Sequence, residues 1–215
     1  KISAQLAGME APGHTELIAA LCGHPEVRML LAGERLRTIH VTTHLALHEA
    51  CHQVTAARVW RTIQLGHQAP RWLGFDRPRI AVAGLNPHAG EEGLFGEEDR
   101  LQIAPAVEQA RGHGLDAMGP LPPDTVFLRA WRGEFDLVVA MYHDQGHIPI
   151  KLVEFDQTVN ITVGLPILRT SVDHGTAFDI VGQDRARPEN MVRAIELAIR
   201  LASHRRTPGI SGDAC

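Results

Sequence analysis

The segment from Met141 to Lys151, MYHDQGHIPIK, concentrates residue types that bind metals, transfer protons and hold anions. It follows the apolar run at residues 135–140 (FDLVVA), which predicts a buried strand that ends where the polar residues begin. Open α/β sheets place their ligands at the ends of such strands. We therefore expect a functional site at this point of the chain.

Three histidines occupy comparable positions, each after an apolar segment: His44 in HVTTH, His88 in GLNPHAGE and His143 in MYHDQG. Three neutral imidazoles can hold a divalent metal and leave one coordination position open. The metal could then polarise a substrate hydroxyl and lower its pKa. The alternative is that they are separate turn or core histidines with ordinary hydrogen bonds. Asp144 could support the site or accept a proton, or it could cap the turn.

Candidate anion-binding residues lie on both sides of these histidines. Thr15, in GHTE, could cap the apolar helix expected at residues 17–22 and offer its hydroxyl to a phosphate or carboxylate; a cap without a ligand is the alternative. Lys151 and Arg169 both lie beside apolar segments and could clamp a phosphate. Two unrelated surface cations would give the same pattern.

The loop at residues 173–182 (DHGTAFDIVG) could receive the flat face of an adenine or a ribose at Gly175, with a buried Asp179 holding the loop in place. A structural turn closed by Gly182 is the alternative. No GxGxxG segment follows a predicted strand, so a standard Rossmann dinucleotide site has no support.

Apolar periodicity predicts the elements that must position these residues. Strands are expected at residues 27–31, 36–41, 79–85, 135–140 and 159–163. Helices are expected at residues 17–22, 45–65, 98–113, 125–131 and 187–204. This alternation predicts an α/β fold with a largely parallel sheet and flanking helices. The polar, Gly-rich tail at residues 205–215 is expected to be loose.

Bulk composition narrows the class of protein. A chain of 215 residues allows one or two domains. A net charge of −4 without runs of Lys or Arg argues against a nucleic-acid surface. We expect no membrane span, because no apolar run approaches the length a span needs, and no secretory signal. Cys22, Cys51 and Cys215 lack CxxC spacing, which disfavours disulfides or a zinc knuckle and favours the cytoplasm.

Seven motifs together resemble the 4-hydroxythreonine-4-phosphate dehydrogenase (PdxA) family. They occur in family-like order over nearly the whole chain. They are GHTE (13–16), HVTTH (40–44), GLNPHAGE (84–91), GPLPPDTVF (119–127), AMYHDQG (140–146), VNITVGLP (159–166) and RTSVDHGTAFDI (169–180).

The resemblance implies an isocitrate/isopropylmalate-dehydrogenase-like fold and an obligate homodimer with its active site at the subunit interface. It also implies NAD as hydride acceptor and one divalent metal ion, which could be Zn, Mg, Co or Mn. The substrate would be a phosphorylated hydroxy acid whose C3 hydroxyl is oxidised, and the resulting β-keto acid would lose carbon dioxide. Residues 1–160 would form the middle domain. Residues 161–215 would form the C-terminal part of the cofactor-side domain.

Residue by residue, the resemblance implies three metal ligands, with His143 coming from the partner subunit: His44, His88 and His143. It implies five residues that hold the phosphorylated substrate: His14, Thr15, Lys151, Asn160 and Arg169. Asp124 and Asp144 match acidic residues near the metal, and we expect Asp144 to handle protons. The loop at residues 173–180 resembles the adenosine-side loop, with His174, Gly175 and Asp179 on the cofactor side.

Two departures from the family pattern matter. The chain lacks a Gly-Asp-Pro-Gly-like start, so we expect roughly the N-terminal third, and part of the cofactor-bearing domain, to be missing from it. The segments GHIPIK (146–151) and GLFGEED (93–99) favour the branch that oxidises 4-phospho-D-threonate or 4-phospho-D-erythronate over the vitamin B6 enzymes. A third branch, which handles aromatic cis-dihydrodiol acids, lacks GHTE and the Asn and Arg phosphate holders.

Two other classes of function stay open. The chain could be a catalytically inert fragment that keeps metal and phosphate pockets but cannot hold NAD. Three histidines and a carboxylate alone would also suit a metal-dependent hydrolase or aldolase.

Overall fold

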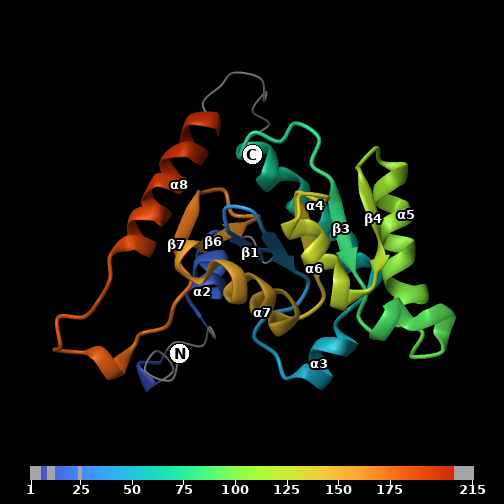
Figure 1. Cartoon of the computed structure of the whole chain (residues 1–215), viewed down its shortest axis with the longest axis horizontal. Coiled ribbons are helices and arrows are strands. Elements are labelled where there is room, and N and C mark those ends of the chain that lie inside the picture. Colours follow the sequence, from blue (N-terminus) through green and yellow to red (C-terminus); the bar gives the residue numbers. More distant parts are fainter. Residues whose placement is uncertain (1–5, 9–12, 24–25, 206–215) are drawn as a thin grey trace.

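The computed structural model describes residues 6–8, 13–23 and 26–205. The strands of these residues form one seven-stranded sheet in the order β4-β3-β5-β2-β1-β6-β7 (Figure 1). The strands are β1 Arg28–Ala32, β2 Arg37–His40, β3 Ile80–Ala83, β4 Ala117–Leu121, β5 Leu137–Ala140, β6 Val159–Val163 and β7 Arg169–Val172. The helices are α2 His14–Leu21, α3 Leu47–His52, α4 Ala56–Trp72, α5 Ala104–Gly112, α6 Pro123–Trp131, α7 His143–Glu154 and α8 Glu189–Arg205.

The sheet has a parallel half and an antiparallel half. Strands β4, β3, β5 and β2 are parallel neighbours. Strands β2, β1, β6 and β7 are paired antiparallel. The switch occurs at the β1–β2 hairpin, where a connection of a few residues can join only antiparallel strands. Since β6 again runs in the direction of β2, most strands point one way, and the expected α/β class with flanking helices is confirmed.

The two faces of the sheet pack into separate cores. In β5, Leu137 and Val139 contact one core, whereas Val138 and Ala140 contact the other, as the two-residue period of a strand requires. The first core includes apolar residues of α4, α5 and α8, and the second those of α6 and α7. In Figure 1, α8 lies beside β7 at one end of the sheet and α5 beside β4 at the other. The sheet therefore has helices on both faces.

Some predicted elements have different boundaries. The helix expected at residues 45–65 is two helices, because Thr55 interrupts it and caps α4 by accepting a hydrogen bond from the Arg58 amide at 3.4 Å. The expected cap at Thr15 is wrong: Gly13 is the N-cap of α2, and Thr15 lies in its first turn. The helix expected at residues 98–113 begins with a wider π-helical turn, Asp99–Ile103.

The domain boundary at residue 160 stays a prediction, and β6 crosses it while continuing the sheet between β1 and β7. The loose tail lies outside the described residues, apart from Arg205 at the end of α8. Among the described helices, none combines the length and the apolar character that a membrane crossing requires.

Helix α7 begins where β5 ends and is anchored there by its own side chains. The Gln145 side chain accepts from the Met141 amide and donates to the Gly84 carbonyl, both at 2.7 Å, which joins the ends of β5 and β3. At Gly146 the helix lies directly against the ring of His40, the last residue of β2. A side chain at position 146 would therefore enter space that the sheet already fills.

We expect Gly146→Ala to lower the free energy of unfolding by about 1–3 kcal/mol, as overpacking of a filled core does. The added Cβ would collide with the His40 ring and lie 3.0 Å from the Ala140 Cβ, and both of these residues are fully buried. Urea unfolding measures the change. Gly112→Ala is the matched control, because a Cβ there meets no atom within 4 Å and alanine favours helix by up to about 1 kcal/mol. Destabilisation of the same size by both changes would contradict the packing argument.

Candidate active site

His44 and His143 lie together because the strands before them are parallel neighbours. His40 of β2 pairs with Ala140 of β5, so the segments that follow these two strands leave the sheet at the same edge. The Thr42 hydroxyl donates to the Met141 carbonyl at 2.8 Å, which holds the two exits side by side. The ring centroids of His44 and His143 are 5.8 Å apart.

Each of these two rings has a carboxylate at its Nδ1. Glu16 Oε1 lies 3.4 Å from Nδ1 of His44, and Asp144 Oδ1 lies 2.6 Å from Nδ1 of His143. A carboxylate at one ring nitrogen fixes the tautomer and leaves Nε2 as the donor to a metal, so the residues fit two ligand positions. In the described part of the chain, however, no group of three or more His, Cys, Asp or Glu side chains is arranged to hold a metal.

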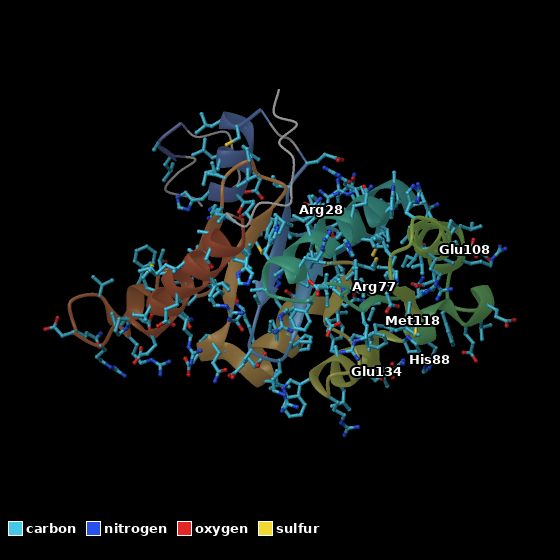
Figure 2. All side chains as sticks on the ribbon, turned by 90° about the horizontal axis from the view of Figure 1, so that it is seen from above. Arg28, Arg77, His88, Glu108, Met118 and Glu134 are labelled. Atoms are coloured by element: carbon cyan, nitrogen blue, oxygen red, sulfur yellow. The ribbon has the colours of Figure 1, made fainter. Side chains whose placement is uncertain are left out.

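His88 lies apart from this pair. It is exposed in the turn Pro87–Gly93, and Figure 2 shows it on the side of the molecule that carries Met118. Its φ is +53°, and its four successors also have positive φ. Left-handed backbone costs about 1–2 kcal/mol per L-residue. Buried Asp99 holds the start of this turn by accepting hydrogen bonds from the amides of Leu85 and Asn86 at 2.8 and 3.1 Å.

This placement favours a different division of the expected metal ligands between two subunits. The sequence expectation assigned His143 to the partner subunit, yet His143 shares a cavity with His44 of its own chain. Of the three expected ligands, His88 is the one that does not line this cavity within a single chain. Backbone strain of this kind accumulates at functional sites, which makes His88 a candidate ligand from a second subunit.

All five expected substrate residues line one cavity of about 380 Å³. It lies on the face of α7 that turns toward β6, β7 and α2. The expected residues that line it are His14, Thr15, His44, His143, Lys151, Asn160, Arg169, His174 and Gly175. Residues far apart in sequence are therefore brought to one site.

The strand register explains how the β6 and β7 residues reach the cavity. Thr162 pairs with Arg169 across the antiparallel ladder, and Asn160, two residues before Thr162, shares its face. Arg169 Nη1 donates to the hydroxyls of Thr162 and Thr15, at 2.6 and 3.1 Å. Burial lowers the pKa of Arg169, but an arginine keeps its charge at neutral pH. A guanidinium held this way can bind an anion without first losing much conformational freedom.

Lys151 provides the second cation of the cavity. Its Nζ lies 3.3 Å from Oδ2 of Asp173 and donates to the Asp173 carbonyl at 3.2 Å. Burial raises the pKa of Asp173, and the Lys151 charge opposes that shift. Asn160 is 9% exposed, and its Oδ1 has no hydrogen-bond partner among the described residues. Leaving a buried amide oxygen without a hydrogen-bond partner costs free energy. A ligand in the cavity could supply the missing donor.

The sequence analysis gave no place in the site to two further histidines: His147, which lines the cavity, and His40, which lies behind it. His147 is 5% exposed and its ring stacks on that of His143, with centroids 3.6 Å apart and planes within 10°. Burial and then the neighbouring His143 lower the pKa of His147 to about 4. The missed signal is the spacing of His143, His147 and Lys151, four residues apart on one face of a helix; the segment was interpreted as a strand end and turn, not as a helix.

The two expected acidic residues lie outside this cavity. Asp124, in the first turn of α6, and Asp144 both line a separate, mostly apolar groove of about 600 Å³ between α6 and α7. Asp144 contacts Nδ1 of His143 and, together with His143 and His44, lines a further cavity of about 520 Å³. In one chain Asp124 is therefore not beside the His44–His143 pair.

The expected cofactor loop borders a second, larger cavity of about 840 Å³. His174 and Gly175 line both this cavity and the substrate cavity, so the two adjoin. Asp179 is exposed and is not among the residues that line either one, so the expectation of a buried aspartate that holds the loop is wrong. Asn190, which the sequence reasoning missed, is 8% exposed, lines the larger cavity and has an unpaired Oδ1 among the described residues.

Known proteins resemble this chain in both sequence and fold. A family model described as "Pyridoxal phosphate biosynthetic protein PdxA" matches residues 1–198. D-threonate 4-phosphate dehydrogenase of Cupriavidus necator is 54% identical over 199 residues, which are 92% of this chain and 60% of that protein. 4-Hydroxythreonine-4-phosphate dehydrogenase of Geobacter metallireducens is also 54% identical, over 91% of this chain and 58% of that protein.

A crystal structure of 4-hydroxythreonine-4-phosphate dehydrogenase from Klebsiella pneumoniae superimposes with a TM-score of 0.82 at 50% identity. The match covers 93% of this chain and 61% of that one. The chain thus spans less than two thirds of the length of these relatives, and the two substrate names occur at equal identity.

Proposed function

The chain belongs to the PdxA family, and on this premise we propose that the protein is an NAD-dependent, divalent-metal-dependent dehydrogenase. It oxidises the C3 hydroxyl of a 4-phosphorylated hydroxy acid, and the β-keto acid that results loses carbon dioxide. The substrates that fit are 4-hydroxythreonine 4-phosphate, 4-phospho-D-threonate and 4-phospho-D-erythronate. We favour the two sugar acids because of the GHIPIK segment.

The observation that carries this proposal is the composition of one cavity. Two cations, Lys151 and Arg169, and the unpaired Asn160 oxygen face the same space as His44 and His143. Cations and a fixed polar group suit a phosphorylated, hydroxylated acid. Two imidazoles whose Nδ1 atoms contact carboxylates suit a metal at its hydroxyl end.

The chain's own residues orient the substrate. Arg169 and Lys151 hold the phosphate, and this remote binding energy aligns C3 for reaction. His44 and His143, with His88 from a second subunit, would hold the divalent metal. A metal at this position would supply Lewis acidity, which favours loss of the hydroxyl proton and later stabilises the electron pair left by carbon dioxide. Asp144, at Nδ1 of His143, keeps that ring in the required tautomer.

The larger cavity fits the cofactor. His174 and Gly175 lie at its border with the substrate cavity, and the unpaired Asn190 oxygen offers an acceptor within it. NAD⁺ would accept the hydrogen and electron pair from C3, which balances the oxidation. Where Asp179 was expected to act, the exposed position gives no support for a role in binding.

The working form we propose is a homodimer with shared active sites. The groove between α6 and α7 is lined by apolar side chains, and Ile148 and Leu152 are 63% and 83% exposed. Asp144, which contacts His143, also lines this groove. A second copy that covers this groove could bring its own His88 to the metal. We place the enzyme in the cytoplasm, where thiols such as those of Cys22 and Cys51 stay free.

A side-by-side assay tests the proposal. The full-length protein is first stripped of metal with a chelator. It is then resupplied with Zn, Mg, Co or Mn and assayed with NAD⁺ and each of the three phosphorylated acids. We expect NADH absorbance to grow only with metal, and one equivalent of carbon dioxide per NADH. Phosphorylated acid consumed without NADH would indicate a hydrolase or aldolase. Binding of phosphate and metal without turnover would indicate an inert fragment.

A further inference from the structure

His147 lies between the histidine end of the substrate cavity, at His44 and His143, and the cationic end at Lys151. On α7 it is one turn after His143 and one turn before Lys151, and it lines the same cavity as both. Its ring stacks on His143, and its Nε2 lies 4.0 Å from Oδ1 of Asp173. This position places its outer ring nitrogen where a substrate carbon chain would pass.

The proton of His40 can be located from its partners. Its Nδ1 is 3.2 Å from the Met29 carbonyl, which can only accept, so Nδ1 carries the proton. The ring is fully buried, and burial followed by the nearby His147 lowers the pKa of His40 to about 3. His40 is therefore neutral, and its Nε2 presents a lone pair.

The proton of His147 follows from that of His40. Its Nδ1 lies 3.1 Å from Nε2 of His40 and 2.9 Å from the His143 carbonyl, and both of these atoms accept. The Nδ1 of His147 must donate, and in the neutral ring the lone pair is on Nε2. Among the described residues, that Nε2 has no hydrogen-bond donor. The carboxylate of Asp173, 4.0 Å away, cannot donate when ionised and already contacts Lys151 at 3.3 Å.

We propose that His147 is a substrate-specificity residue, whose Nε2 accepts a hydrogen bond from the C2 hydroxyl of the phosphorylated acid. This inference rests on the proposed function, in which the C3 hydroxyl faces the metal and C2 is the other hydroxyl-bearing carbon. A hydrogen bond to a neutral acceptor replaces the hydrogen bond to water that the hydroxyl loses on binding. It compensates a C2 ammonium poorly, because the ammonium loses the solvation of a full charge and Asp173 is already paired with Lys151. His147 therefore selects sugar acids over amino acids of the same length.

The test compares two ligands that differ only at C2: 4-phospho-D-threonate and 3-hydroxy-4-phosphobutanoate. Their dissociation constants are measured by calorimetry on the metal-loaded, full-length protein without NAD. We expect the natural protein to bind the C2-hydroxyl ligand about tenfold more tightly, as expected for a buried acceptor otherwise left unpaired. The ratio within each variant is independent of how much of that variant is folded.

Two isosteric variants separate binding from structure. Glutamine places its amide near the Nε2 position of histidine, whereas asparagine places its amide near Nδ1. A binding role predicts that His147→Gln keeps most of the preference for the C2 hydroxyl and that His147→Asn loses it. The reverse pattern would show that only the Nδ1 contact to His40 matters and would overturn the inference.

The failures of the two proposals are distinguishable. If the natural protein binds both ligands equally and tightly, His147 has no role in specificity, although the proposed function stands. If it binds neither ligand nor inorganic phosphate, the proposed function itself fails, and this inference fails with it.

Discussion

A heterodimer with His88→Ala in one subunit and His143→Ala in the other is expected to keep about half of the natural kcat, because a twofold dimer has two equivalent shared sites. A homodimer of either variant should lose activity about a thousandfold or more, since the metal lowers the activation free energy by several kcal/mol. In the mixed dimer one site takes both altered ligands and the other takes none. Differently tagged subunits, co-expressed and purified by both tags, allow the measurement.

The pairing of variants tells which ligands share a chain. His44 and His143 lie in one cavity of one chain, with ring centroids 5.8 Å apart. A heterodimer of His44→Ala with His143→Ala should therefore stay inactive, since each site contains one altered ligand. If His143 instead came from the partner, as the sequence expectation had it, this pair would recover activity. Metal content is measured independently of turnover. We expect one ion per dimer in the heterodimer of His88→Ala with His143→Ala, and none in that of His44→Ala with His143→Ala.

Most of the fold was predictable because the strands are short apolar runs between polar residues. The predicted strands at 79–85, 135–140 and 159–163 are confirmed as β3, β5 and β6. β7 was not predicted: all four of its residues, Arg169–Val172, are partly exposed, so it has no apolar run to recognise. The break between α3 and α4 was also missed, because the amphipathic pattern continues through it and the signal is the single capping hydroxyl of Thr55.

The site was predictable to the extent that each residue belongs to a motif at a strand end. The residues expected to hold phosphate converge because β6 and β7 pair next to α7, which no local pattern could show. Asp173 and His40 lie within quoted motifs but received no role from the sequence, because their importance arises from burial against Lys151 and His147. The displaced position of His88 depends on a left-handed turn held by Asp99, a long-range feature that composition does not encode.

We expect Arg169→Ala to raise KM for the phosphorylated acid about ten- to a hundredfold, which corresponds to the 1.5–3 kcal/mol of a hydrogen bond to a charged group. Arg169 is held in place by the hydroxyls of Thr15 and Thr162, so its charge is aimed into the cavity. KM for NAD⁺ should change little, because Arg169 lines the substrate cavity and is not among the residues of the larger one. Steady-state kinetics with each reactant varied in turn gives both constants.

The unphosphorylated acid isolates the phosphate contact, because the natural protein and Arg169→Ala should use it almost equally poorly. Arg169→Lys keeps the charge but not the fork that matches a phosphate, so its KM should fall between the two. Arg100→Ala is the matched surface control, since that arginine is 61% exposed and, in the described part of the chain, pairs only with Glu97 of its own turn; such a pair contributes little. Equal rises in KM for the phosphorylated acid and for NAD⁺ would mean that Arg169 supports the fold of the site, and the phosphate assignment would be withdrawn.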